Sequence, residues 1–306
     1  MKIYAPNYYS KFSCTADKCK HSCCIGWEID IDKDTLSYYN NLSGSFGETV
    51  KNSIECTDGV YHFRLDEKER CPHLNSSNLC NIITNLGKDS LCQICADHPR
   101  FRNFFEEREE IGLGLCCEEA AKIILSAEDK FSLVDLTPDS PDSNAAEINF
   151  FKIRQEIFDT ISHREIEINE RLKELLTSNF VSLPEISIKR WFKLLSTLES
   201  LDSQWTETLK NAAIADYESK NILTPLQIEN LFTYFIFRHL PCGFQNNNYK
   251  PQIAFAYIST LIINELCSYM GYNTTEGIIE ICRMYSTEIE YSEENLYIIF
   301  DFLDNN

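Results

Sequence analysis

The chain has 306 residues, and 43% of them are hydrophobic, which is enough to build the core of one large domain or two ordinary ones. Asp and Glu outnumber Lys and Arg by 47 to 28, so the formal net charge is −19. Such a charge repels phosphate backbones and argues against nucleic acid as a partner. It favours a basic, lysine-bearing protein surface instead.

Two segments bear on the compartment. The N-terminal stretch "MKIYAPNYYSKF" lacks the apolar run of a secretory signal, which predicts a cytoplasmic protein. The most apolar stretch, "IAFAYISTLIINEL" at 253–266, contains polar residues and is shorter than the roughly 18 residues of a membrane span. We therefore expect a buried helix there, and no membrane partner.

The first third of the chain is rich in cysteine. Eleven of the fourteen cysteines lie at or before Cys117. A reducing cytosol argues against disulfides, which leaves metal binding or redox chemistry. Cys242, Cys267 and Cys282 stand among apolar residues at helical spacing, so we expect them to behave as small hydrophobic side chains.

The predicted fold is mainly α, with a cysteine-rich metal-binding module at residues 1–135. In that module "WEIDID" at 27–32 and "VYHFRL" at 60–65 alternate apolar with polar residues, the period of half-buried strands that could pair as a small β-ribbon. Helices are expected after Asp32, through "TLSYYNNL", and from Cys117, through "CEEAAKIIL".

A linker and a helical bundle are predicted after this module. Prolines alternate with Asp and Ser around residues 136–146, which is linker composition. From 147 to 306 successive segments carry apolar stripes at helical spacing, which predicts an all-helical domain. One helix start is specific: Thr224 as cap, Pro225 in the first turn and Gln227 three residues after the cap.

The spacing of the thiols leaves the metal open. Dense thiolates suit zinc or an iron–sulfur cluster, but only Cys92 and Cys95 have the Cys-x2-Cys spacing of a zinc knuckle. The adjacent Cys23 and Cys24 cannot easily bind one ion, which favours a cluster or more than one metal. A zinc-stapled fold without chemistry is the alternative. Cys56 is expected to be a spare thiol, and His21, His73 and His98 are expected to be bystanders.

Four blocks of sequence carry a resemblance to a known family. "FSCTADKCKHSCCIGWEIDIDKDTLSYY", "CPHLNSSNLCNI", "LGKDSLCQICADHPR" and "LCCEEAAKIIL" resemble the flagellin lysine-N-methylases, within a wider group of cysteine-cluster proteins that chelate iron or zinc. The downstream "ENLFTYFIFRHLPCGFQ" also resembles this family. The resemblance implies methylation of lysine ε-amines on flagellin, dependent on S-adenosylmethionine, with a 4Fe-4S cluster. The cysteines that match the motif are Cys14, Cys19, Cys23, Cys24, Cys71, Cys80, Cys95 and Cys117, with Cys92 and Cys116 as extras beside them.

No standard cofactor motif accompanies these blocks. "GLGL" at 112–115 is the nearest approach to a nucleotide-binding glycine loop and lacks its third glycine, and no Cys-x3-Cys-x2-Cys of a radical enzyme is present. Candidates for the cofactor site are Trp27, which could stack on adenine, Arg100, which could bind a carboxylate, and Glu118, which could accept a hydrogen bond. Core packing, a surface arginine and a helix first-turn carboxylate are the plain alternatives for these three.

No residue is singled out as the catalytic base. The sequence therefore predicts a protein-lysine methylase. A non-catalytic metal-chelating or interaction protein and a cluster-dependent redox enzyme are the alternatives.

Overall fold

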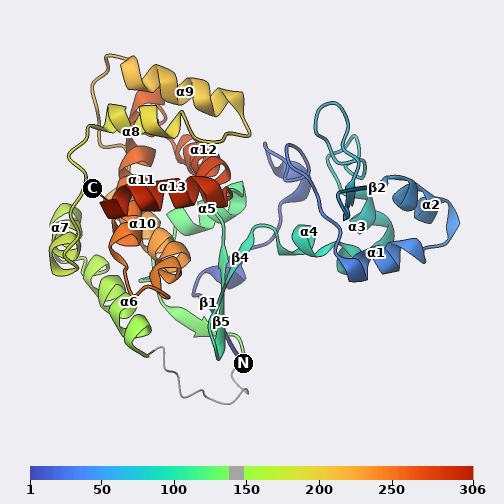
Figure 1. Ribbon diagram of the computed structural model, residues 1–306, viewed down its shortest axis with the longest axis horizontal. Coiled ribbons are helices and arrows are strands. Elements are labelled where there is room, and N and C mark those ends of the chain that lie inside the picture. The colour runs from blue at the N-terminus through green and yellow to red at the C-terminus, as the bar shows by residue number, and fades with distance from the viewer. Residues whose placement is uncertain (138–147, 306) are drawn as a thin grey trace. The chain divides into compact units, whose positions relative to one another are not determined.

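The computed structural model describes residues 1–137 and 148–305, and the chain forms two compact units (Figure 1). We call Ser13–Arg100 the cysteine unit, and Met1–Phe12 together with Phe101–Asn306 the helical unit. These boundaries differ from the predicted division into 1–135 and 147–306. Of the predicted linker 136–146, the part from residue 138 lies outside the described residues.

The pairing of the first strand explains where the units divide. The helical unit contains a sheet of order β4-β5-β1-β6, formed by β1 (Lys2–Pro6), β4 (Arg100–Phe104), β5 (Arg108–Leu113) and β6 (Leu133–Asp135). β1 runs parallel to β5, with Ile3 opposite Glu109, and antiparallel to β6, with Ala5 opposite Val134. These ladders tie the start of the chain to segments that follow the cysteine unit.

The predicted mainly α fold is confirmed, and helices make up most of the helical unit (Figure 1). They are α5 (Glu118–Leu125), α6 (Ile148–Ile161), α7 (Ile168–Ser178), α8 (Ile188–Leu195), α9 (Ser203–Ile214), α10 (Pro225–His239), α11 (Lys250–Met270), α12 (Thr275–Tyr285) and α13 (Glu293–Asn305). The predicted start of α10 is confirmed: Thr224 and Gln227 form a reciprocal capping box, and Pro225 lies in the first turn.

The core of the helical unit is built around α10 and α11, which pack against each other. Every residue of α10 from Leu231 to His239 is buried, because other elements cover it on all sides. Among the described residues, α11 alone is long and apolar enough to pass for a membrane span, and 67% of its most apolar window is buried inside the protein. A core helix of a folded protein has this character.

The cysteine unit is small and irregular. Its elements are α1 (Lys33–Asn40), α2 (Gly44–Asn52), β2 (Ile54–Thr57), β3 (Val60–Phe63), α3 (Asn81–Leu86) and α4 (Gln93–Asp97). α1 begins after Asp32, as predicted, and the Asp32 carboxylate accepts a hydrogen bond from the Thr35 N–H. A compact core surrounds Tyr39, Val50 and Phe63, and two cysteines, Cys71 and Cys92, are part of it.

The predicted β-ribbon exists with a different partner. The full ladder of β3 is with β2 and only a short pairing joins β3 to the 27–32 segment, and Asp58 and Gly59 make the hairpin turn with positive φ. An Asp-Gly pair between apolar runs is a strong signal for a hairpin turn, and a prediction based on alternation alone overlooks it. The 27–32 segment lies along the other side of β3 and forms one bridge, Asp30 to His62.

Candidate metal centre and buried polar clusters

Five thiols converge in the cysteine unit. All five belong to or pack against one small core, and a negative charge on several of them raises the pKa of others in the group. We call this group the thiol cluster, and its members are Cys24, Cys71, Cys80, Cys92 and Cys95. Four of them belong to the predicted ligands, and the fifth, Cys92, is one of the predicted extras.

Backbone contacts bring these cysteines together from distant parts of the chain. The Cys71 N–H donates to the Cys24 carbonyl at 2.9 Å, and a bridge between Leu74 and Cys80 folds the next segment back. Cys80 caps the N-terminus of α3, and Cys92 caps that of α4. Cys95 follows within the first turn of α4, so both thiols of the Cys-x2-Cys pair face the same neighbourhood.

Burial and mutual contact control the protonation of the thiol cluster. Burial raises the pKa of Cys71 to about 12. A hydrogen bond with Cys92, together with burial, holds the pKa of Cys95 far above its ordinary value. In Cys24 the hydrogen bond with Cys23 outweighs burial and lowers the pKa to about 7. A metal would have to displace the protons of the high-pKa thiols, so its binding must release protons.

No three thiols of the cluster lie as close together as a single zinc ion requires. Four sulfurs at the Zn–S distance of about 2.3 Å lie about 3.8 Å apart in a tetrahedron. Within residues 1–137 and 148–305, the one group of three potential ligand atoms that all lie within 4.8 Å of each other contains no cysteine.

The other predicted ligands are not members of the thiol cluster, although Cys23 forms a hydrogen bond with Cys24. Cys14 and Cys23 are exposed and Cys19 is half-buried; the Cys14 sulfur accepts from the Ala16 N–H, and Cys19 contacts the Thr15 hydroxyl at 3.0 Å. Cys117 belongs to the helical unit, where it caps α5.

Of the three late cysteines, Cys267 and Cys282 are fully buried, as predicted. The expectation for Cys242 is wrong: it is exposed, because it lies in a 3-10 turn that follows α10. Cys56 is exposed in β2. His73 is a core residue whose ring packs edge-on against Phe63, and burial lowers its pKa to about 4.

Two of the three cofactor candidates, Trp27 and Arg100, lie near His98 in the cysteine unit. The Trp27 ring lies 5.9 Å from the His98 ring, and its indole N–H donates to the Cys23 carbonyl at 2.5 Å. Burial, with a smaller effect of the Arg100 charge, lowers the pKa of His98 to about 4, so His98 is neutral at pH 7. The third candidate, Glu118, lies in the first turn of α5 in the helical unit.

The "GLGL" segment has a packing role. Leu113 and Leu115 are fully buried at the end of β5. A Cβ atom at Gly112 would overlap the ring of Phe101, which packs directly on the backbone there. The glycine therefore permits close approach of an aromatic ring within the core.

A buried polar cluster in the helical unit has no counterpart in the sequence predictions. The Tyr234 hydroxyl donates to Glu290 at 2.9 Å and accepts from Arg238 at 2.8 Å, and His239 Nε2 lies 2.6 Å from the same carboxylate. Burial would raise the pKa of Glu290, but Arg238 and His239 outweigh it and lower that pKa. The groups satisfy one another and hold the π-helical segment Ser286–Glu290 against α10.

Comparison with known proteins identifies the family. A family model described as the FliB lysine N-methylase C-terminal domain matches residues 87–306, well over half of the chain. The chain belongs to this family. The resemblance seen in the cysteine motifs is thereby confirmed. The FliB match includes Cys92, Cys95 and Cys117, whereas Cys14 to Cys80 precede it.

Curated relatives of this FliB-family chain carry related names. A lysine-N-methylase of Salmonella typhimurium (strain LT2) is 26% identical over 144 residues, which is 44% of this chain and 35% of the relative. The flagellar biosynthetic protein FliU of Salmonella muenchen is 28% identical over 137 residues, which is 43% of this chain and 81% of the relative. The match therefore spans about a third of the lysine-N-methylase. No solved structure matches the chain.

Proposed function

We propose that this chain is a protein-lysine methylase that uses S-adenosylmethionine and a 4Fe-4S cluster, with flagellin as its substrate. Membership of the FliB family and the names of the relatives support the reaction class. The single observation that carries the proposal is the convergence of five thiols from four separate segments in one small core.

The thiol cluster suits an iron–sulfur group better than a single zinc ion. Cysteine thiolates are the usual ligands of such clusters. An inorganic core lies between its ligand sulfurs, so it does not require three sulfurs to meet within 4.8 Å, and no three of these thiols do. Cys24, Cys71, Cys80 and Cys95 are the proposed ligands, and Cys92 is positioned to replace one of them.

The bound cofactors divide the chemistry with the protein. S-adenosylmethionine would supply the methyl group for the lysine nitrogen and would leave as S-adenosylhomocysteine, and the four proposed cysteine ligands would hold the cluster in the core of the cysteine unit. The Trp27 ring, held by its hydrogen bond to Cys23, offers a flat face for a purine. Arg100 offers a guanidinium for a carboxylate.

The protein must also supply a neutral lysine, because an ammonium has no lone pair for attack. Free lysine loses its proton near pH 10.4, so the site has to desolvate the amine or accept its proton. The net charge of −19 attracts a lysine-bearing surface and so favours encounter with a basic protein segment.

A second function, a structural metal staple without catalysis, is favoured by one observation. Cys71 and Cys92 are buried among Ile29, Val50 and Phe63, so a metal there would hold the core of the cysteine unit together. Such a protein would bind metal without transferring methyl groups.

Metal analysis and a methylation assay separate the two functions. Protein purified without oxygen should contain iron and acid-labile sulfide and absorb visible light, and it should methylate lysines of flagellin, read by mass spectrometry. Cys80→Ser should lose both iron and activity. Cys56→Ser, an exposed thiol of the same unit, should keep both. A colourless protein with stoichiometric zinc and no methylation would establish the structural staple.

A further inference from the structure

A second group of potential ligands lies on the hairpin side of the cysteine unit. His62 of β3 faces Asp30 across one strand pairing and Glu55 of β2 across the other. The Ile31 N–H donates to the Tyr61 carbonyl and the Phe63 N–H donates to the Ile29 carbonyl, so Asp30 and His62 form a non-hydrogen-bonded antiparallel pair. Side chains approach most closely in such pairs, and Glu28, two residues before Asp30, projects from the same face.

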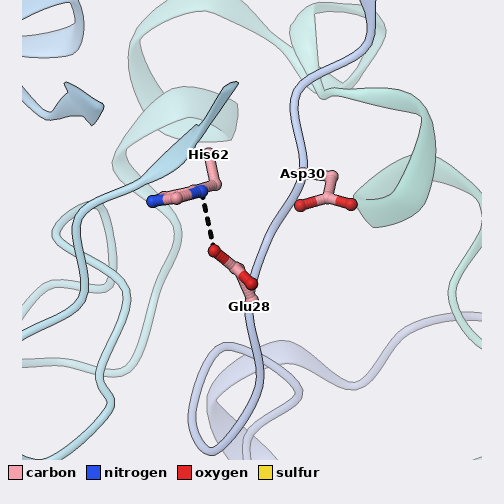
Figure 2. Close-up of side chains that lie close together, drawn as sticks. All are labelled: Glu28, Asp30 and His62. Atoms are coloured by element: carbon pink, nitrogen blue, oxygen red, sulfur yellow. Dashed lines mark ion pairs between the residues drawn. The ribbon is translucent and has the colours of Figure 1, made fainter. Parts of the chain in front are cut away.

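The ring of His62 is buried, with 6% of its side chain exposed, and carboxylates face both of its nitrogens. Nδ1 lies 2.7 Å from a Glu28 oxygen, and Nε2 lies 3.1 Å from a Glu55 oxygen. Figure 2 shows Glu28 and Asp30 together on the Nδ1 side of the ring. Nδ1 nevertheless lacks a hydrogen bond of acceptable geometry, although it is fully buried.

On its Nε2 side, the His62 ring is held in the way that is typical of metal-binding histidines. Glu55 accepts from Nε2, and Arg64 Nε donates to the other Glu55 oxygen at 2.8 Å, which fixes that carboxylate. Metal-binding histidines usually donate one N–H to a carboxylate in this way, which leaves the lone pair of the other nitrogen for the metal. Here that lone pair belongs to Nδ1, which points toward two carboxylates.

Charge gives a reason for a cation at this place. Three carboxylates surround one imidazole, and Arg64 is the basic partner of Glu55 alone. A divalent cation between Nδ1, Glu28 and Asp30 would neutralise the two remaining carboxylates and use the unsatisfied nitrogen. The ligand atoms already lie within 4.8 Å of one another.

We propose that Glu28, Asp30 and His62 form a divalent-cation site, separate from the thiol cluster, that takes Zn²⁺ with nitrogen and oxygen ligands. The imidazole nitrogen is a borderline donor that suits Zn²⁺ better than Ca²⁺ or Mg²⁺, and zinc also accepts carboxylate oxygens. Two of the ligands are exposed, so the ion can enter from solvent and keep water in its open position. The ion would clamp the 28–30 segment onto the hairpin.

Asp30 provides the sharpest test. Within the described part of the chain, His62 forms ion pairs with Glu28 and Glu55 but not with Asp30, so replacing Asp30 leaves both ion pairs in place. The full chain, as purified without oxygen, is titrated with Co²⁺. Thiolate-bound Co²⁺ gives intense sulfur-to-metal bands, whereas a site of nitrogen and oxygen donors gives only weak ones. We expect wild type to bind one equivalent with the weak spectrum, and Asp30→Asn to lose it.

Two further variants make the result specific. Glu55→Gln should keep the equivalent but bind it about 10–100-fold more weakly, the usual cost of losing an outer-shell partner. Glu67→Gln, an exposed acid of the same unit, should bind Co²⁺ like wild type.

Zn²⁺ should also raise the melting temperature of wild type and not that of Asp30→Asn, since a ligand stabilises only the state that binds it. If Asp30→Asn binds the same equivalents as wild type and gains the same thermal shift, the three residues form only an ion-pair cluster and the proposal is wrong.

Discussion

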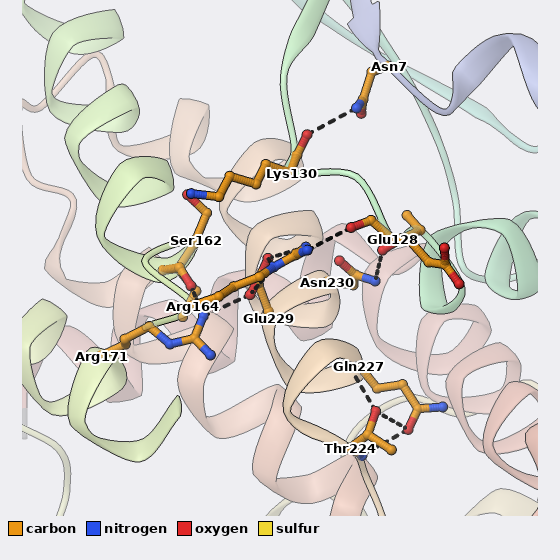
Figure 3. A network of polar contacts seen from close by, with 12 residues as sticks. Asn7, Glu128, Lys130, Ser162, Arg164, Arg171, Thr224, Gln227, Glu229 and Asn230 are labelled. Carbon is orange, nitrogen blue, oxygen red and sulfur yellow. Dashed lines mark hydrogen bonds and ion pairs between the residues drawn. The ribbon is translucent and has the colours of Figure 1, made fainter. Parts of the chain in front are cut away.

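Single residues in the helical unit show how a buried charge dictates its surroundings. Glu229 of α10 is buried, and its carboxylate accepts from Arg164 at 2.8 Å and from Arg171 at 2.7 Å (Figure 3). Arg171 is itself buried, in α7, while Arg164 reaches the Glu128 carbonyl with its other nitrogen. One acid thus connects α10 to α7 and to the turn that precedes it.

Removing that acid tests its importance. Glu229→Gln leaves Arg171 charged and buried without a counter-ion, so we expect a loss of about 3 kcal/mol in the free energy of unfolding. Urea denaturation followed by circular dichroism measures it. Lys122→Gln, which breaks the pair of the exposed Lys122 with Glu119 within α5, should cost less than about 0.5 kcal/mol. Equal losses in the two variants would contradict a special role of Glu229.

At the scale of elements, local sequence signals and structure agree best at helix ends. The Thr224 hydroxyl accepts from the Gln227 N–H, and the Gln227 side chain accepts from the Thr224 N–H. These two bonds satisfy donors that any helix leaves unpaired in its first turn. Most residues of the helix that they start are buried, so its start affects the core around it.

Replacing the cap measures this contribution. Thr224→Ala removes one partner of the capping box and should destabilise the protein by about 1 kcal/mol. Thermal unfolding measures the change. Thr224→Ser keeps the hydroxyl and should match wild type within experimental error. A Ser variant as unstable as the Ala variant would show that the threonine methyl group, and not the cap, matters.

At the scale of the whole molecule, the two units are stabilised in different ways. The helical unit has a large apolar core in which α10 and α11 are buried on nearly all sides. The cysteine unit has a small core, and cysteines make up part of it. Small domains with small cores usually need metals or cross-links, because too little apolar surface is buried to offset chain entropy.

Metal removal should therefore affect the two units unequally. Binding of metal to thiols is itself folding free energy, so stripping it from the holoprotein should unfold the cysteine unit first. Hydrogen exchange read by mass spectrometry should show faster exchange in residues 13–100, with protection in residues 101–306 unchanged. A uniform loss of protection along the chain would mean that the units unfold together.

Local signals in the sequence therefore reveal the elements and predict a kind of chemistry. Apolar periodicity identified the helices, the capping pattern identified the start of α10, and the density of thiols indicated metal binding. Such features depend on residues within a few positions of each other. The hairpin of β2 and β3 also had a local signal in Asp58-Gly59, which the alternation pattern did not use.

Contacts between distant residues were decided only by the tertiary structure. Spacing along the chain did not distinguish Cys24 and Cys71, which a backbone hydrogen bond joins, from Cys14, which is exposed. The division into units depends on the pairing of β1 with β5 and β6. His62 meets Glu28 and Asp30 because β3 lies against the 27–32 segment. The sequence by itself determined the helices, and the density of its thiols predicts metal binding. Only the folded chain shows which side chains share a site. Pairing between distant segments depends on the combined packing of many residues, so no single stretch of sequence carries a periodic pattern that predicts it.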